Sequence, residues 1–190
     1  MAPMVVIGCA LVAFVDIALG LVIGHGFGRW WYHEPHLWVY LAGPLLALLP
    51  DADIPLQLLI ERLGQRQLVA HRQIIHYPLA LVPLFFVVYP WHPFLAWLTV
   101  LCVGAHFVHD SIGNAWGIQW LQPFSSLHII LLTPDRTGAR RFIQLIPHRD
   151  VMARGRQSTE AFVRKRYCGL TPEVARAILS LAGALVILML

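Results

Sequence analysis

Residues 74–112 read IIHYPLALVPLFFVVYPWHPFLAWLTVLCVGAHFVHDSI, a stretch in which Asp110 is the only Asp, Glu, Lys or Arg. Two apolar runs, Ile74–Tyr89 and Phe94–Ile112, flank the short segment Pro90–Pro93. Runs of 16 to 19 residues at 1.5 Å per residue approach the roughly 30 Å thickness of a bilayer core. Because the two prolines interrupt a helix, we expect two antiparallel membrane helices joined by a tight turn.

The rest of the chain has the same character. Of its 190 residues, 58% are hydrophobic and 13% are charged, whereas a soluble domain carries about 25% charged residues. Three further apolar runs, Met4–Ile23, Leu37–Leu49 and Val174–Leu190, can cross or enter a bilayer. The sequence therefore predicts an all-α, multi-pass transmembrane bundle of four to five spans, with residues 1–190 forming a single membrane domain. Three scattered cysteines predict neither a disulfide framework nor a thiolate metal site.

Basic residues set the expected orientation of this bundle. Nine of the fourteen Lys and Arg residues lie between Asp135 and Thr171, and such an excess is typical of segments that stay in the cytoplasm. We therefore expect an inner-membrane protein with a cytoplasmic amino terminus, whose basic segment 134–172 forms short helices on anionic lipid headgroups. This topology also accounts for the formal net charge of +4, so nucleic acid is not an expected partner. The sequence leaves the oligomeric state open.

Three polar segments interrupt the apolar runs: Pro50–Asp53, His71–His76 and His106–Asp110. In the predicted topology, the first ends the second helix, the second opens the third helix and the third closes the fourth helix. All three then lie at the same cytoplasmic membrane depth, where ionisable groups mark functional sites. We expect His71 on the loop before the third helix and His76 on its first turn. This shared depth predicts a single site.

The side chains in these segments suit a metal ion. His106 and Asp110 are one helical turn apart and share a face. The proline before Asp51 favours a turn on which the carboxylates of Asp51 and Asp53 point inward together. A single arginine, Arg72, cannot neutralise three carboxylates, so a divalent metal explains the cluster better than an ion-pair network. Mixed imidazole and carboxylate ligands favour Zn, with Mn or Fe as alternatives, over Ca. The expected ligands are Asp51, Asp53, His71, His76, His106 and Asp110.

Three more polar residues have expected roles. Arg72 would bind a phosphate or a developing oxyanion. His109 lies beside His106 and Asp110, near the loop that follows the helix. A non-ligand imidazole in this place can carry a proton. Asp16 is a lone carboxylate in a predicted span, which makes it either a functional residue or a hydrogen-bonded structural one.

The ordered set P-D-x-D, H-R-x-x-x-H and G-x-x-H-x-x-x-D, followed by G-x-x-x-L-x-P-F/W, resembles the YdjM-like inner-membrane family of metal-dependent hydrolases. In this chain the set stands at Pro50–Asp53, His71–His76, Gly104–Asp110 and Gly117–Phe124, within residues 48–125. The resemblance implies a membrane-embedded metal site and a hydrolase activity. The chain departs from the pattern because no histidine occurs in Met1–Val6 and its third motif is one residue shorter between Gly and His. The alternative to the proton-carrying role is therefore that His109 is a metal ligand in place of the missing histidine.

We therefore expect a membrane-embedded metal-dependent hydrolase, in which metal-activated water cleaves an ester, amide or phosphoester bond of an amphiphilic, lipid-like substrate. Two alternatives stay open. The pattern H-x-x-x-D in paired helices also holds zinc in divalent-cation transporters, although transport sites lie near the membrane midplane. The other alternative is a non-catalytic scaffold that binds a partner through Arg136–Arg166 and tolerates loss of the histidines.

Overall fold

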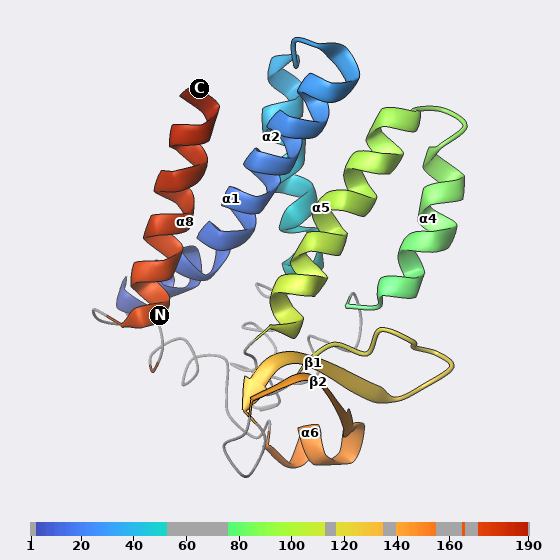
Figure 1. The fold of residues 1–190 in the computed structure, drawn as a ribbon, viewed down its shortest axis with the longest axis vertical. Helices are drawn as coiled ribbons and strands as arrows, with labels where there is room; N and C mark the ends of the chain where they lie inside the picture. Colours follow the sequence, from blue (N-terminus) through green and yellow to red (C-terminus); the bar gives the residue numbers. More distant parts are fainter. Residues whose placement is uncertain are drawn as a thin grey trace.

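The computed structural model describes residues 3–52, 76–112, 117–134, 140–154, 165 and 171–189. Most of these residues are helical, and two strands form one hairpin (Figure 1). The helices are α1 (Pro3–Tyr32), α2 (Leu37–Ala47), α4 (Leu81–Val88), α5 (Pro93–Ser111), α6 (His148–Arg154) and α8 (Pro172–Met189). The 3-10 turns η1 (Leu49–Asp51) and η3 (Pro78–Ala80) follow α2 and precede α4, and the strands are β1 (Leu127–Pro134) and β2 (Arg140–Pro147).

Helix α1 is at the centre of the bundle. It contacts α2, α5 and α8, while α5 also contacts α2 and α4. In Figure 1 the β1–β2 hairpin and α6 lie across the end of the bundle where α5 finishes. Buried Val39 and Ala47 of α2 pack with Phe94, Leu98 and Cys102 of α5 in one apolar cluster. This core holds α2 against α5, so the polar residues at the ends of the two helices stay close together.

Helices α1 and α2 cross at two glycines. A Cβ atom on Gly20 would lie 2.5 Å from backbone atoms of Gly43 and Pro44, which is closer than carbon atoms approach. The absence of a side chain therefore lets the two backbones meet, as small residues do at helix interfaces in membranes. The crossing places Asp16, one turn before Gly20, inside the bundle, where it is 2% exposed.

The expected pair of antiparallel helices is confirmed by α4 and α5, which contact each other along the bundle. His92 caps α5, because its Nδ1 accepts a hydrogen bond from the backbone nitrogen of Leu95 at 3.2 Å. Helix α4 is shorter than the predicted run from Ile74 to Tyr89. Tyr77 is extended, with φ −112° and ψ 99°, since a residue before proline avoids the helical region.

The structure corrects the prediction of an all-α fold, because the basic segment holds a strand as well as the expected short helix, α6. Residues 127–147 hold an antiparallel hairpin in which Leu127 pairs with Pro147 and Leu131 pairs with Ile143. Arginines indicate the side of the membrane on which a segment is expected to lie. They do not indicate whether the segment is a helix or a strand. Its apolar residues alternate between two faces of the hairpin, which is the strand period, and α6 is a short helix packed on both strands. The fold is therefore mostly helical with a small sheet.

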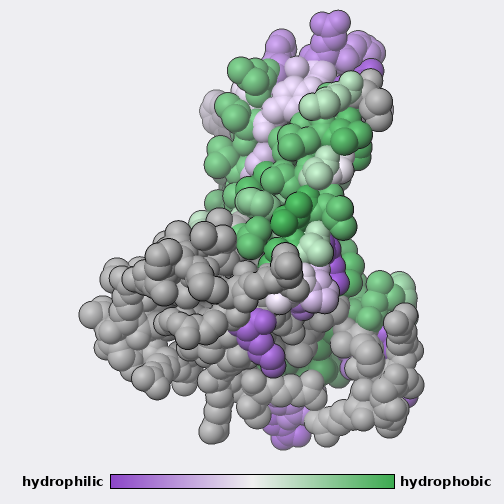
Figure 2. Space-filling view, turned by 90° about the vertical axis from the view of Figure 1, so that its left-hand side faces the viewer, coloured by the Kyte–Doolittle hydropathy of each residue, from purple (hydrophilic) through white to green (hydrophobic). Residues whose placement is uncertain are grey.

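Two helices in the described part of the chain, α5 and α8, are long and apolar enough to cross a membrane. Helices α2 and α4 have 11 and 8 residues, which span about 12 to 17 Å at 1.5 Å per residue. The prediction of four to five spans therefore stays a prediction. Figure 2 shows hydrophobic side chains over much of the helical part and hydrophilic residues at its far end.

Candidate metal centre

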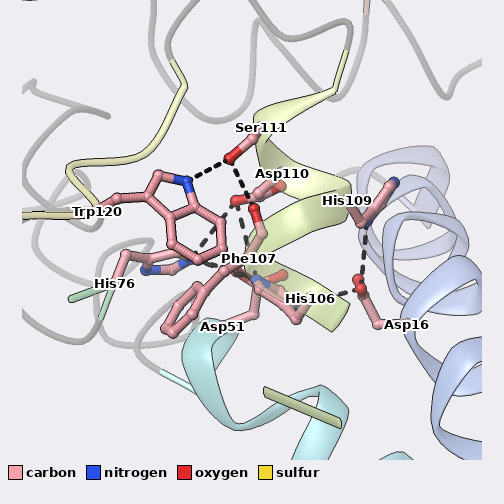
Figure 3. A network of polar contacts seen from close by, with 9 residues as sticks. All are labelled: Asp16, Asp51, His76, His106, Phe107, His109, Asp110, Ser111 and Trp120. Carbon is pink, nitrogen blue, oxygen red and sulfur yellow. Dashed lines mark hydrogen bonds and ion pairs between the residues drawn. The ribbon is translucent and has the colours of Figure 1, made fainter. Parts of the chain in front are cut away.

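Three segments that are far apart in the sequence meet at one end of the bundle (Figure 3). Asp51 is the last residue of η1, directly after α2. His106 and Asp110 come from the last turns of α5. His76 precedes η3 and is not on the first helical turn as predicted, because Pro78 begins the turn and keeps the chain before it extended.

The four side chains direct their polar atoms at one another. Nε2 of His76 and Nε2 of His106 are 3.4 Å apart. Oδ1 of Asp51 lies 3.4 Å from the first nitrogen and 3.8 Å from the second, and Oδ2 of Asp110 lies 3.6 and 3.9 Å from them. The imidazole side chains are 0% and 1% exposed, whereas the two carboxylates are 16% and 15% exposed. The cluster is therefore closed on its imidazole side and reachable on its carboxylate side.

These separations fit a metal-ligand set. Zn binds imidazole nitrogen and carboxylate oxygen tetrahedrally at about 2.0 to 2.2 Å, which places neighbouring ligand atoms about 3.3 to 3.6 Å apart. The five separations of 3.4 to 3.9 Å are close to that range. The donor chemistry fits as well, because two facing imidazole nitrogens can share only one proton. Asp51, His76 and His106 form the tightest group, with all their donor atoms within 4.8 Å of one another.

Asp16 of α1 lies behind His106. Its Oδ1 is 3.2 Å from Nδ1 of His106, which is the ring nitrogen that does not face His76. A carboxylate in this position orients a metal-binding imidazole and increases its basicity. The sequence marks Asp16 as a lone carboxylate in a predicted span, but 90 positions separate it from His106. Nothing local in the sequence connects the two residues.

His109 is directed toward α1. Its Nδ1 lies 3.2 Å from Oδ1 of Asp16, the same oxygen that faces His106, and 34% of its side chain is exposed. Figure 3 shows the ring above Asp16, on the α1 side of α5. The ring of His109 therefore faces Asp16, and its role as a proton carrier or as a ligand stays a prediction.

Aromatic side chains cover the two imidazoles. The ring centre of Phe107 is 6.0 Å from that of His106 and 6.1 Å from that of His76. Trp120 packs edge-on against Phe107, and its Nε1–H donates to Oγ of Ser111 at 2.9 Å. Sequence analysis identified neither the tryptophan nor the serine as part of the site. The motif at Gly117–Phe124 contains Trp120 only at an unspecified position, and Ser111 lies outside it.

The structure therefore brings together four of the predicted ligands: Asp51, His76, His106 and Asp110. Asp53, His71 and Arg72 lie outside the described residues, so their roles stay predictions.

Comparison with known proteins supplies a family but no individual relative. A search of curated proteins and a search of solved structures found no match. The family model described as YdjM inner membrane protein matches residues 11–189. That range includes Asp16 and all four side chains of the cluster. Because the match extends over nearly the whole chain, the protein belongs to the YdjM inner membrane protein family.

Proposed function

We propose that the protein is a membrane-embedded, metal-dependent hydrolase that cleaves an ester, amide or phosphoester bond in a lipid-like substrate. The observation that carries this proposal is the grouping of Asp51, His76 and His106, whose donor atoms lie within 4.8 Å of one another. Two imidazoles and a carboxylate form the ligand set of many hydrolytic zinc sites, which leave a further position for water or substrate.

Each clustered side chain has a role in this proposal. Asp51, His76 and His106 would hold a divalent metal, with Zn the best fit and Mn or Fe as alternatives. When bound, such a metal lowers the pKa of water and polarises the bond to be cleaved. Asp110, which is 15% exposed and 3.6 Å from His76 Nε2, would be a carboxylate shared with a second metal, so that the first metal keeps its further position for water. Phe107 would exclude bulk water from the imidazoles.

The other predicted residues extend the site. Asp53 and His71 are proposed as further ligands, and Arg72 is proposed to bind the phosphate or oxyanion of the substrate. His109, held by Asp16 and partly exposed, is proposed to carry protons between the site and solvent. We place the amino terminus and the site on the cytoplasmic side, where the basic segment 134–172 would meet anionic headgroups.

The position of the cluster at helix ends supports the proposal of hydrolysis over transport. Asp51 ends η1 after α2, His76 precedes η3, and Asp110 is the second-last residue of α5. All three therefore lie at helix ends, whereas the binding sites of secondary transporters lie near the membrane midplane. This placement suits a site that meets substrate at the membrane surface.

Metal analysis of the detergent-purified protein, prepared without chelators, tests the proposal. We expect at least one divalent transition metal per chain in the wild type and its loss in His76→Ala and His106→Ala. His25→Ala is the matched control, because His25 contacts Tyr40 at 3.1 Å and belongs to no part of the cluster. Wild-type protein without metal above background would refute the site.

Activity is tested separately on the metal-loaded protein. Ester, amide and phosphoester lipids are presented in mixed micelles, with and without chelator, and we expect chelator-sensitive release of one product class. Metal-loaded protein that hydrolyses none of them, yet moves zinc across proteoliposome membranes, would favour transport over hydrolysis.

A further inference from the structure

One face of the β1–β2 hairpin is covered by protein over part of its length, whereas Phe142, on the same face by strand alternation, is 71% exposed. Ile130 of β1 and Ile146 of β2, which are 1% and 8% exposed, form a buried cluster with Val151 of α6. His128, on the same face by strand alternation, is 5% exposed. Helix α6 contacts both strands, and in Figure 1 it lies on the side of the hairpin away from α4 and α5.

The opposite face of the hairpin is apolar and largely exposed, although Ile129 and Leu131 are half-buried. Leu127, Ile129 and Leu131 belong to it, and they pair with Pro147, Leu145 and Ile143. Leu145 is 59% exposed and Ile143 is 54% exposed. An antiparallel sheet with one face in water normally alternates apolar with polar residues. This hairpin instead exposes a row of aliphatic side chains on the face turned toward the helical bundle.

The exposed row continues the outer surface of α5. Trp97, Leu101 and Val108 form a stripe on one side of that helix and are each 40% to 43% exposed. The stripe ends at Ile112, which is 43% exposed and forms a bridge with Leu131 of the hairpin. Helix α5 meets the criteria for a membrane span, so this stripe is surface that lipid would cover. The bridge therefore joins the end of the α5 stripe to the strand that carries Leu131.

Positive charge lies at the margin of this face. Arg141 pairs with Thr133 at the turn end of the hairpin and is exposed. Nine basic residues occur between Asp135 and Thr171. Such a combination of exposed aliphatic side chains with flanking arginines is typical of elements that lie in the membrane interface.

We propose that the hairpin Leu127–Pro147 is an interfacial membrane element, with the row Leu127, Ile129, Leu131, Ile143 and Leu145 inserted at the boundary between headgroups and acyl chains. Arg141 contacts the phosphate of anionic phospholipids. The exposed Arg149 of α6 remains in water, on the other side of the hairpin from the inserted row. This assignment does not depend on the proposed hydrolase activity.

Spin labels on the full chain test the placement. Cys9, Cys102 and Cys168 are replaced by Ala, one nitroxide is attached at Leu145→Cys or at the control Arg149→Cys on α6, and the protein is reconstituted in vesicles of phosphatidylcholine and phosphatidylglycerol. Arg149 is the matched control because its side chain is 88% exposed. We expect oxygen to relax the label at 145 more strongly than an aqueous nickel chelate does, and the reverse at 149.

Two outcomes would overturn the proposal. If the chelate relaxes the label at 145 as strongly as the label at 149, the row faces water. If neither reagent reaches the label at 145, another protein surface covers the row.

The role of Arg141 has its own test. Leaving phosphatidylglycerol out of the vesicles should weaken the preference of the label at 145 for oxygen. With phosphatidylglycerol present, Arg141→Gln should weaken this preference by the same amount. A dependence on phosphatidylglycerol that survives Arg141→Gln unchanged would refute the role of Arg141.

Discussion

Oδ1 of Asp16 lies 3.2 Å from Nδ1 of His106, so a carboxylate of α1 supports an imidazole of α5 from the side opposite the cluster. The contact is buried, with the two side chains 2% and 1% exposed. It joins the packing of α1 to the geometry of the metal centre, because any shift of α1 moves the group that orients His106.

Replacing this carboxylate should weaken metal binding without removing a ligand. We expect Asp16→Asn to lower zinc affinity by about 10- to 100-fold, as loss of an outer carboxylate does at other sites. Competition with a fluorescent zinc chelator measures the affinity. Asp150→Asn is the control, since Asp150 pairs with the exposed Arg149. Equal affinities for Asp16→Asn and wild type would show that Asp16 does not position the ligand.

The two histidines at the end of α5 should respond differently to the same substitution. His106→Gln removes a ligand and should lose both metal and activity. His109→Gln should keep the metal and reduce turnover by about 10² to 10⁴, the usual effect of losing a proton-transfer group. Metal content and turnover are measured on the same preparation. If His109→Gln loses metal as completely as His106→Gln, His109 is a ligand.

The α1–α2 crossing should not tolerate a methyl group. Gly20→Ala places a Cβ against the backbone of Gly43 and should destabilise the protein by about 1 to 3 kcal/mol. Unfolding in mixed micelles with increasing sodium dodecyl sulfate measures this change. Gly26→Ala is the control in the same helix, because an added Cβ there meets nothing within 4 Å. Similar unfolding curves for the two variants would contradict the close crossing.

The hydrogen bond from Trp120 to Ser111 should couple the loop after α5 to the helix end. Trp120→Phe and Ser111→Ala should each cost about 0.5 to 1.5 kcal/mol. The double variant should cost less than the sum, because both substitutions remove the same bond. A double-mutant cycle in the same unfolding assay gives the coupling, and strict additivity would mean that the bond contributes nothing.

The orientation of the bundle can be tested with single cysteines. We expect a membrane-impermeant maleimide added from the periplasm to label His33→Cys, in the segment after α1, and to miss Arg154→Cys at the end of α6. Mass spectrometry of the intact protein gives the extent of labelling. The reverse pattern would place the cluster on the periplasmic side.

Much of this architecture follows from local sequence signals. The pair α4 and α5 was predictable because prolines and apolar runs act over a few residues. The cluster residues could be named because imidazoles and carboxylates in apolar surroundings are costly unless they bind something. The sequence could not predict that Asp16 would contact His106, since that depends on how closely α1 approaches α2.

The hairpin was missed for a different physical reason. The arginines between Asp135 and Thr171 indicate which side of the membrane a segment occupies, but they carry no strand or helix period. The strands carry apolar residues on both faces, and Ile130 and Ile146 of one face pack on Val151. These partners come from three separate elements, and only the folded chain brings them together.

The glycine crossing also sets the helical phase of the metal centre. Each residue of an α-helix turns the chain by about 100°, and four residues separate Asp16 from Gly20. One residue inserted between them would keep the glycine contact with Gly43 but rotate the carboxylate by about 100°, away from His106. The interval between a packing residue and a polar residue is therefore as much a requirement of this site as the identity of its ligands.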